Sequence, residues 1–496
     1  MIEAFWQQFV YHPDEPMIFC TSLFIFLFAL FTLVYALLRH QLKARLLFVT
    51  AFSYYFYYKS SGFYFFLLAV VTLSDFFLAE CIYNDLQERP DDNRRRKRYL
   101  ILSLLIDLGL LAYFKYTNFF VGMLAQMVGH NFQPWDIFLP VGISFFTFQS
   151  LSYTLDVYRG QLKPLDSLLD YAFFVSFFPQ LVAGPIVRAR DFVPQIRQVP
   201  RVSPRMRAYG VYFILVGALK KCVVSDYISI NFVDRVFEDP TLYSGLEILM
   251  GIYGYALQIY CDFSGYSDMA IGIALLLGFV FNKNFDAPFK SSSISQFWHR
   301  WHISFSSWIR DYLYIFALGG NRKGKVRTYV NLMITMLLAG LWHGAALNYV
   351  VWGGLHGIAL SAHRFLRMDV LHRDRHYRPV GWRLWGSVFL TFHFVCFTFL
   401  FFRNTDFSVT WIMLSRLFTD FHPELLGQLL SGYGWVVFVM ALGFIGHFLP
   451  KRWLEEVVDF LYGGGLLAQG MALVFVIWLI IQVKSSEIMP LIYFQF

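Results

Sequence analysis

Long apolar segments recur along this chain and constrain its fold more than any other feature of the sequence. A helix needs about 20 mainly apolar residues to cross a lipid bilayer. The runs here are continuous rather than alternating, which favours helices over the strands of a membrane barrel. They lie near residues 17–38, 46–58, 62–83, 99–114, 117–129, 138–157, 168–185, 208–224, 244–260, 263–281, 328–347, 348–366, 384–402, 434–449 and 470–483. The sequence therefore predicts an all-α, polytopic membrane helix bundle.

Composition and run length set the expected number of spans. Of the 496 residues 57% are hydrophobic and only 15% are charged, which excludes a soluble globular domain of this size. Several runs are too short to cross alone, and we expect these to be re-entrant or interfacial helices. The others predict about 11–13 spans. We see no internal repeat or low-complexity tract, so we expect one membrane domain over residues 1–496.

Basic residues gather in short loops between the apolar runs, as topology determinants do. The main basic loops are 39–45, 89–98, 188–207, 322–327 and 364–383. The positive-inside rule places these loops in the cytosol and the acidic N-terminus outside. Counting spans onward places the C-terminus outside as well. The formal net charge of +8 thus reflects membrane topology, and we expect no nucleic acid among the partners.

A histidine stands inside one of the apolar runs. His343 lies in Thr328–Leu347, where a polar titratable ring is costly and indicates a functional site. Gly340 and Gly344 flank it, so another backbone or a substrate can approach the ring closely. Neutral imidazole is well suited to take a proton from a hydroxyl. The alternative is a core histidine that hydrogen-bonds to a neighbouring helix.

A second unusual segment, Phe297–Tyr314, is amphipathic when read as a helix. One face carries Trp298, Trp301, Phe305, Trp308 and Tyr312, and the next face carries His299, His302, Ser306 and Arg310. This pattern is equally typical of an interfacial helix that is anchored by its tryptophans. A zinc site formed by both histidines with His343 is a weaker alternative, because no carboxylate or thiol completes it.

Two carboxylates, Asp262 and Asp268, stand at the start of the apolar run 263–281. Helix capping, or pairing with an arginine, explains them better than a chemical role.

Several stretches together carry a specific resemblance to a known family. They are LPVGISFFTFQSLSYTLDVYRG (139–160), FFPQLVAGPIVR (177–188), DFSGYSDMAIGIALLLGF (262–279), FWHRWHISFSSWIRDYLY (297–314), GGNRKG (319–324), LAGLWHGAALNYVVWGGLHG (338–357) and the terminal IYFQF (492–496). With these stretches the chain resembles the membrane-bound O-acyltransferase (MBOAT) family, in particular its bacterial, AlgI-like alginate O-acetyltransferase branch.

The resemblance implies both a fold and an activity. The fold is a ring of helices around a thinned centre, where a cytosolic funnel and an outer opening meet near the histidines. His343 is then the catalytic histidine and His302 the second histidine of the site. Members of this branch lie in the bacterial inner membrane. They pass an acyl group, commonly acetyl, from a cytosolic thioester towards an exported polysaccharide, through an SGNH-like acyltransferase outside the membrane.

These expectations combine into one mechanism. His343 acts as general base on an acceptor hydroxyl, which attacks the thioester carbonyl. His302 orients the acceptor or stabilises the developing negative charge, helped by nearby donors such as Trp298 or Arg310. Supporting roles at the substrate are predicted for Trp298, Trp301, Arg310, Asp311 and Asp262.

We expect no resident cofactor and no metal. The acyl thioester is a co-substrate, either acetyl-CoA or an acylated carrier protein, and the basic loop 322–327 can meet its anionic part. Membrane lipid surrounds the bundle.

The C-terminal segment Leu491–Phe496 is apolar and aromatic, and it is predicted to lie on the outer side. The simpler interpretation is an aromatic plug that packs against the helix ends. The functional interpretation is that the Tyr493 hydroxyl takes the acyl group as a transient phenolic ester and passes it to the external partner.

Two other classes of function compete with acyl transfer. A proton-coupled transporter or channel would also use intramembrane histidines, but it predicts two related halves, and we see none. A glycosyltransferase of lipid-linked sugars would need an exposed acidic pair, for which the short outer loops offer no obvious candidate.

Overall fold

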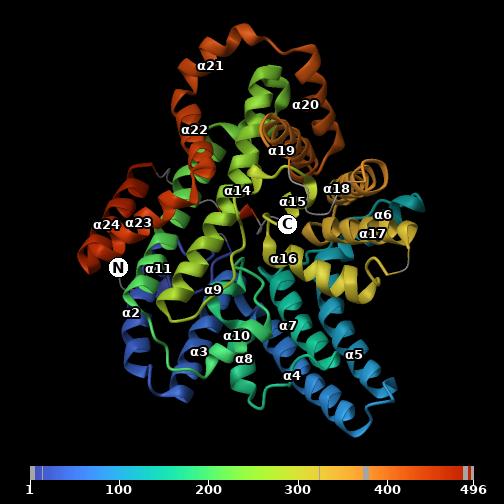
Figure 1. Ribbon diagram of the computed structural model, residues 1–496, viewed down its shortest axis with the longest axis vertical. Coiled ribbons are helices and arrows are strands. Elements are labelled where there is room, and N and C mark those ends of the chain that lie inside the picture. Colours follow the sequence, from blue (N-terminus) through green and yellow to red (C-terminus); the bar gives the residue numbers. More distant parts are fainter. Residues whose placement is uncertain (1–5, 14, 323, 373–378, 484–489, 493–496) are drawn as a thin grey trace. The chain divides into compact units, whose positions relative to one another are not determined.

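The structure is a computed structural model, and it describes all residues except 1–5, 14, 323, 373–378, 484–489 and 493–496. Throughout the described residues the chain forms helices and no strand, which confirms the predicted all-α class (Figure 1).

The chain folds as two compact units. The first unit contains residues 1–214 and 269–282, and the second contains 215–268 and 283–496. Each unit is described by itself below. The expected single membrane domain over residues 1–496 stays a prediction.

The first unit packs its helices around α7, where every residue from Ile143 to Val157 is buried. Its helices are α2 (Ser22–Leu38), α3 (Leu42–Ser61), α4 (Phe65–Glu88), α5 (Arg94–Leu111), α6 (Thr117–Met127), α7 (Ile143–Tyr158), α8 (Leu168–Ser176), α9 (Phe178–Leu181), α10 (Ala189–Ile196) and most of α11 (Pro204–Ala218). A helix buried on all sides carries no solvated face, which explains why α7 has no amphipathic pattern.

The second unit holds every predicted site residue that the structure describes. Its helices are α12 (Asp226–Ile228), α13 (Asp234–Glu238), most of α14 (Gly245–Leu276), α15 (Ile294–Trp298), α16 (Ile303–Trp308), α17 (Lys325–His343), α18 (Leu347–Phe365), α19 (Trp382–Arg403), α20 (Phe407–Thr419), α21 (Leu426–Gly432), α22 (Gly434–Phe448), α23 (Lys451–Gly463) and α24 (Gly465–Val483). π-helical turns also occur, at Leu219–Ser225, Ser229–Val233, Ile309–Ala317 and Leu366–Val370. Such turns are rare in proteins overall, and many of those that occur lie at functional sites.

Fewer segments than expected are long and apolar enough to cross a membrane alone. Among the described residues these are Leu42–Glu88, Arg94–Met127, Trp382–Arg403 and Gly465–Val483. The bent pair Pro423–Gly432 and Gly434–Phe448, with 95° between its helices, adds a fifth if it acts as one span. Many other runs fold as short helices, or their helices carry polar residues. The predicted number of about 11–13 spans therefore stays a prediction.

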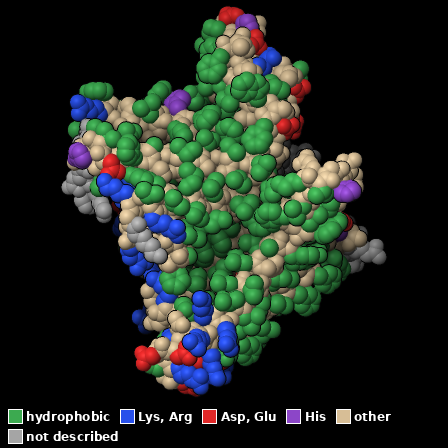
Figure 2. All heavy atoms as spheres, turned by 90° about the vertical axis from the view of Figure 1, so that its right-hand side faces the viewer, with side chains coloured by type: hydrophobic (Ala, Val, Ile, Leu, Met, Phe, Trp, Pro, Cys, Tyr) green, Lys and Arg blue, Asp and Glu red, His purple; other side chains and the backbone are tan. Residues whose placement is uncertain are grey.

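The surface supports a membrane environment for the protein. On the face drawn in Figure 2, hydrophobic side chains cover broad continuous areas, and lysine and arginine gather in separate patches. Exposed apolar areas of this extent are rare on soluble monomers.

Helices α17 and α18 lie side by side in the second unit (Figure 1), and glycines bring their backbones together. A Cβ atom on Gly340 would collide with the carbonyl oxygen of Tyr349, and one on Gly353 would collide with that of Met336. The Cβ position of Gly353 lies only 3.2 Å from the Cα atom of Gly340. Small residues allow this backbone-to-backbone approach, which packs helices tightly in membranes.

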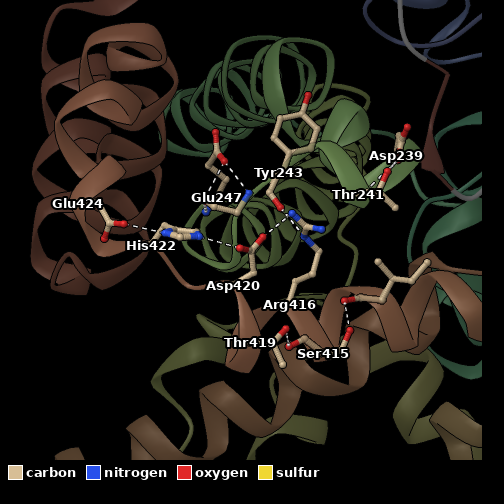
Figure 3. A network of polar contacts seen from close by, with 12 residues as sticks. Asp239, Thr241, Tyr243, Glu247, Ser415, Arg416, Thr419, Asp420, His422 and Glu424 are labelled. Atoms are coloured by element: carbon tan, nitrogen blue, oxygen red, sulfur yellow. Dashed lines mark hydrogen bonds and ion pairs between the residues drawn. The ribbon is translucent and has the colours of Figure 1, made fainter.

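A polar network joins the end of α20 to the start of α14 (Figure 3). The amide of Gly245 donates to the carbonyl of Asp420, whose carboxylate pairs with Arg416. The ring nitrogens of His422 face Glu424 at 2.7 Å and Asp420 at 2.8 Å. These hydrogen bonds raise the pKa of His422, and the hydrogen bond with Glu424 has the larger effect. Because the pKa of His422 is raised, its contribution to stability is present below the ordinary histidine pKa while the carboxylates stay ionised, and it is lost as the pH rises through the raised value.

The close approach of α17 and α18 makes Gly353→Ala disruptive. The added methyl group has no room beside Met336, so the helices must separate, and we expect a loss of about 1–3 kcal/mol in unfolding free energy. Thermal unfolding of the purified protein in detergent measures this. Gly354→Ala on the same helix is the control, because its Cβ meets only Leu337 Cδ2 at an ordinary 3.5 Å. Equal unfolding midpoints for the two variants would contradict the close packing.

Candidate functional site

His343 is the last residue of α17, and aromatic rings surround its imidazole. The ring is buried, with its centroid 4.8 Å from that of Trp342 and 5.1 Å from those of Trp352 and Phe402. The helix ends here because Gly344 is extended, and a Cβ on Gly344 would collide with the Tyr349 ring. The predicted catalytic histidine therefore sits at a helix end inside an aromatic enclosure.

His302 lies in the break between α15 and α16, in an uncommon backbone conformation. Its φ of 44° and ψ of 57° are left-handed, which few residues other than glycine adopt and which often marks a functional site. The side chain is fully buried, and the Phe263 ring packs edge-on against it at 4.6 Å between centroids. This backbone turn directs His302 into the core, away from the more exposed His299.

Asn284 determines which nitrogen of His302 carries the proton. The Asn284 amide nitrogen donates to the Ser267 hydroxyl at 3.0 Å, so its oxygen Oδ1 is the acceptor. The backbone and the hydroxyl of Ser304 both donate to this Oδ1, and His302 Nδ1 lies 3.2 Å from it. Nδ1 must therefore be the donor, and in the neutral ring Nε2 holds the lone pair.

The structure brings His302 and His343 together through one phenylalanine. The centroid of the Phe305 ring is 5.1 Å from that of His302 and 5.5 Å from that of His343. Phe305 also stacks on Trp342 at 4.2 Å. In the sequence Phe305 falls on the apolar face of its segment, and no role in the site is predicted for it. Its spacing of three residues from His302, one helical turn, was the available signal.

Phe305 also lines a pocket of about 240 Å³. The lining residues are Ser295, Trp298, His299, Ile303, Phe305, Ser306, Ser307, Ile309, Arg310, Tyr314, Leu332, Thr335, Met336, Ala339 and Leu360. Serines, a histidine and an arginine make part of this wall polar, and the remainder is apolar or aromatic. A pocket of this kind suits a ligand with one apolar and one polar end.

The other predicted residues have distinct surroundings. Arg310 lines the pocket, and its Nε pairs with Asp311 Oδ1 at 2.7 Å, with the arginine half exposed. Trp301 is buried among aromatic rings, 5.2 Å from Phe285 and 5.5 Å from Phe399 between centroids. Both arrangements are compatible with supporting roles.

Trp298 forms a hydrogen bond with another histidine, His356. Its Nε1 donates to Nδ1 of His356 at 3.3 Å, so that Nδ1 is an acceptor. The Nε2 of His356 lies 3.1 Å from the hydroxyl of Thr398, which itself donates to the Val395 carbonyl. His356 is thus a core histidine with both nitrogens satisfied. The single N–H of Trp298 is engaged here and is not available to a developing negative charge.

Asp262 belongs to a separate polar cluster. Its Oδ1 pairs with Lys221 Nζ at 2.6 Å, so its cation is a lysine and not an arginine. Lys221 also pairs with Asp226 at 2.8 Å. Tyr493 is the candidate relay residue, predicted to carry the acyl group as a phenolic ester before it passes to the external partner. It lies outside the described residues.

A metal site has no ligand set in the part of the chain that the structure describes. No group of three or more His, Cys, Asp or Glu residues lies there in positions that would hold an ion. The zinc interpretation of the histidines thus has no support from this geometry.

Comparison with known proteins gives the family. A sequence model described as the membrane-bound O-acyltransferase family matches residues 161–405. The chain is 38% identical over 410 residues to the "Probable alginate O-acetylase AlgI" of Pseudomonas aeruginosa, covering 81% of this chain and 75% of that protein. It is 37% identical over 355 residues to the peptidoglycan O-acetyltransferase of Helicobacter pylori, covering 66% of this chain and 65% of that protein.

A more distant relative transfers a different group. The chain is 30% identical over 281 residues to the teichoic acid D-alanyltransferase of Bacillus subtilis, covering 54% of this chain and 69% of that protein. Together with the helical fold and the extensive apolar surface, these similarities show that the chain belongs to the membrane-bound O-acyltransferase family, an acyltransferase of the membrane.

Proposed function

We propose that the protein moves an acetyl group from a cytosolic thioester to hydroxyls of an exported polysaccharide in the bacterial inner membrane. The observation that carries the proposal is the pair of buried histidines on Phe305, beside a pocket of about 240 Å³. Acetyl is favoured because the two O-acetylating relatives reach 37% and 38% identity, whereas the D-alanylating relative reaches 30%.

In this mechanism His343 is the general base. Neutral imidazole takes the proton of an acceptor hydroxyl, whose oxygen attacks the thioester carbonyl. The C–S bond breaks, and the thiolate leaves and takes a proton, so the imidazole is restored. The rings of Trp342, Trp352 and Phe402 enclose His343. This enclosure keeps water from the site and limits hydrolysis of the thioester.

The tautomer of His302 favours one of its two predicted roles. Because Nδ1 donates to Asn284, the neutral ring presents an acceptor at Nε2. A negative oxygen would need a donor, whereas this nitrogen can bind an N–H or O–H group of the acceptor molecule other than the hydroxyl whose single proton goes to His343. We therefore assign His302 to orient the acceptor molecule.

The pocket beside Phe305 is the proposed site for the donor. Its apolar wall would receive the acyl thioester, and Arg310 would meet the anionic part of the carrier. Arg310 suits this task because guanidinium binds phosphate in a bidentate manner and is half exposed here. Coenzyme A and an acyl carrier protein both present such a phosphate. The final acceptor lies outside the membrane, where an SGNH-like acyltransferase would receive the group.

Replacing the histidines one at a time tests these roles. His343→Gln should lower kcat by at least about 100-fold, because a positioned general base contributes about 10²–10⁴ to a rate. His302→Gln should also be severely impaired, because the amide does not reproduce the imidazole acceptor held by Asn284. His299→Gln is the comparison variant, and we expect it to lower kcat much less, because glutamine keeps this part of the pocket wall polar.

The assay follows radiolabelled acetyl from each thioester donor to the acceptor, with folding of each variant verified by size-exclusion chromatography. Near-normal turnover by folded His343→Gln protein would refute general-base catalysis by His343. Equal losses in all three variants, with bound metal detected by elemental analysis, would favour the zinc alternative.

Tyr493 provides a test of an outward relay. We propose that its phenol oxygen is the first acceptor, forms an aryl ester as the thiolate leaves, and then passes the acyl group to the external partner. Phenoxide is a much better leaving group than an alkoxide, so the second transfer is favourable. Tyr493→Phe keeps the aromatic packing and removes only the nucleophile. We expect a folded variant that fails to acylate the polysaccharide, and wild-type acceptor acylation by this variant would leave the tail as packing alone.

A further inference from the structure

Pro490 and the first two residues of the C-terminal segment, Leu491 and Ile492, are held by two buried charged side chains. The backbone amide of Ile492 donates to Oδ2 of Asp262 at 2.9 Å. Lys221 Nζ donates to the carbonyl of Pro490 at 3.4 Å. Leu491, between these two contacts, is buried with 1% of its surface exposed. Both polar contacts are made to main-chain atoms, two residues apart.

The two charged side chains also hold each other. Lys221 Nζ lies 2.6 Å from Asp262 Oδ1 and 2.8 Å from Asp226 Oδ1, and Lys221 and Asp262 are each 1% exposed. Asp262 is in the middle of α14, and Lys221 is in the π-helical turn Leu219–Ser225. A carboxylate with one oxygen on a lysine and the other on an amide has its orientation fixed from both sides.

A small polar cavity of about 40 Å³ adjoins this contact, and Pro490 and Ile492 form part of its wall. Its other lining residues are Lys221, Ser225, Asp226, Ser229, Asp234, Tyr255, Gln258, Asp262 and Arg403. A second ion pair stands here, between Arg403 and Asp234 at 2.9 Å. The volume has room for about one water molecule. The segment therefore packs against a polar cluster and not only against apolar helix ends.

Burying these charges costs free energy that a segment which only seals the bundle would not need to spend. Desolvating a buried ion pair costs several kcal/mol per ion, and well-packed hydrophobic residues of similar size are often equally stable. Apolar side chains would close the surface as well. Buried charges do something that apolar packing does not, because they fix the register of a chain through directional bonds to its backbone.

We infer that Asp262 and Lys221 form a main-chain clamp that positions the C-terminal segment for acyl transfer. The inference rests on the proposed function, because the residue that follows the clamped Ile492 is the candidate relay residue. The clamp recognises an N–H group and a C=O group rather than side chains. It makes Asp262 a positioning residue, in place of the substrate contact predicted from the sequence.

The decisive change is Ile492→Pro, which removes the N–H group that Asp262 binds. In proline the ring carbon Cδ takes the place of the amide hydrogen, so Asp262 loses its donor and its carboxylate must also move away from the backbone nitrogen. Ile492→Val is its matched control, because it retains the N–H group and most of the side chain. Asp262→Leu removes the acceptor from the other side of the bond. Asp268→Asn is its control, since it breaks a different ion pair of α14, the one with Lys220.

Two readouts separate the clamp from the relay. Hydrogen exchange of the Leu491 amide, followed by mass spectrometry of the whole protein in detergent, reports how firmly the segment is held. Kinetics of acceptor acylation report its role in transfer. In Ile492→Pro and Asp262→Leu we expect exchange at least about tenfold faster, the factor for losing a charge-assisted hydrogen bond. We also expect kcat to fall at least tenfold, while KM for the thioester donor stays within about twofold.

The two control variants should match wild type in both readouts. Unchanged exchange in Asp262→Leu and Ile492→Pro would overturn the clamp, and so would faster exchange with normal kcat. A parallel rise in the KM for the donor would also overturn it, because that indicates general damage to the bundle. Failure of the relay is distinguishable, since it shows as normal acylation by Tyr493→Phe and leaves the exchange result unaffected.

Discussion

The contact between the backbones of α17 and α18 governs the position of the central histidine. Gly340 and Gly353 allow the two helices to approach without intervening side chains, and a methyl group on either would meet a carbonyl oxygen. This contact places Trp352 of α18 5.1 Å from the His343 ring, between centroids. Gly344 then ends α17 against Tyr349, so His343 lies at the end of a rigid pair of helices. In a membrane, where apolar side chains gain little by leaving lipid, such close packing is a main source of helix association.

The surroundings of the buried histidines indicate which of them are structural and which can take part in chemistry. His356 uses both ring nitrogens, on Trp298 and Thr398, and is therefore a structural residue. His302 has Nδ1 fixed as a donor by Asn284, so in the neutral ring Nε2 is the acceptor nitrogen. The enclosure of His343 is aromatic, which suits a group that must be neutral at rest and take up a proton during the reaction. The role of each histidine thus depends on the residues that surround its ring as much as on the ring itself.

The sequence predicted the fold class and His343 for local reasons, whereas His302 was singled out by the family resemblance. Helical membrane segments follow from local hydropathy, and a histidine in an apolar run is a local anomaly, so both features can be seen within about 20 residues. Which side chains meet in space does not follow from such local patterns, even over a short separation. Asn284 lies 18 residues before His302, and the lysine that pairs with Asp262 lies 41 positions earlier, at Lys221. The sequence favours an arginine as the partner of Asp262 and a donor role for Trp298, but a lysine pairs with Asp262 and His356 binds the Trp298 N–H group.

General-base catalysis by His343 is the central claim, and the pH dependence of a single turnover tests it most directly. The purified enzyme is mixed with labelled thioester, and the first transfer to the acceptor is followed at each pH under conditions where chemistry limits the rate. Only neutral imidazole accepts a proton, so the account predicts a rate that rises with pH through the histidine range. The residual rate of His343→Gln should lack this rise. A wild-type rate that is flat over the same range would contradict the account.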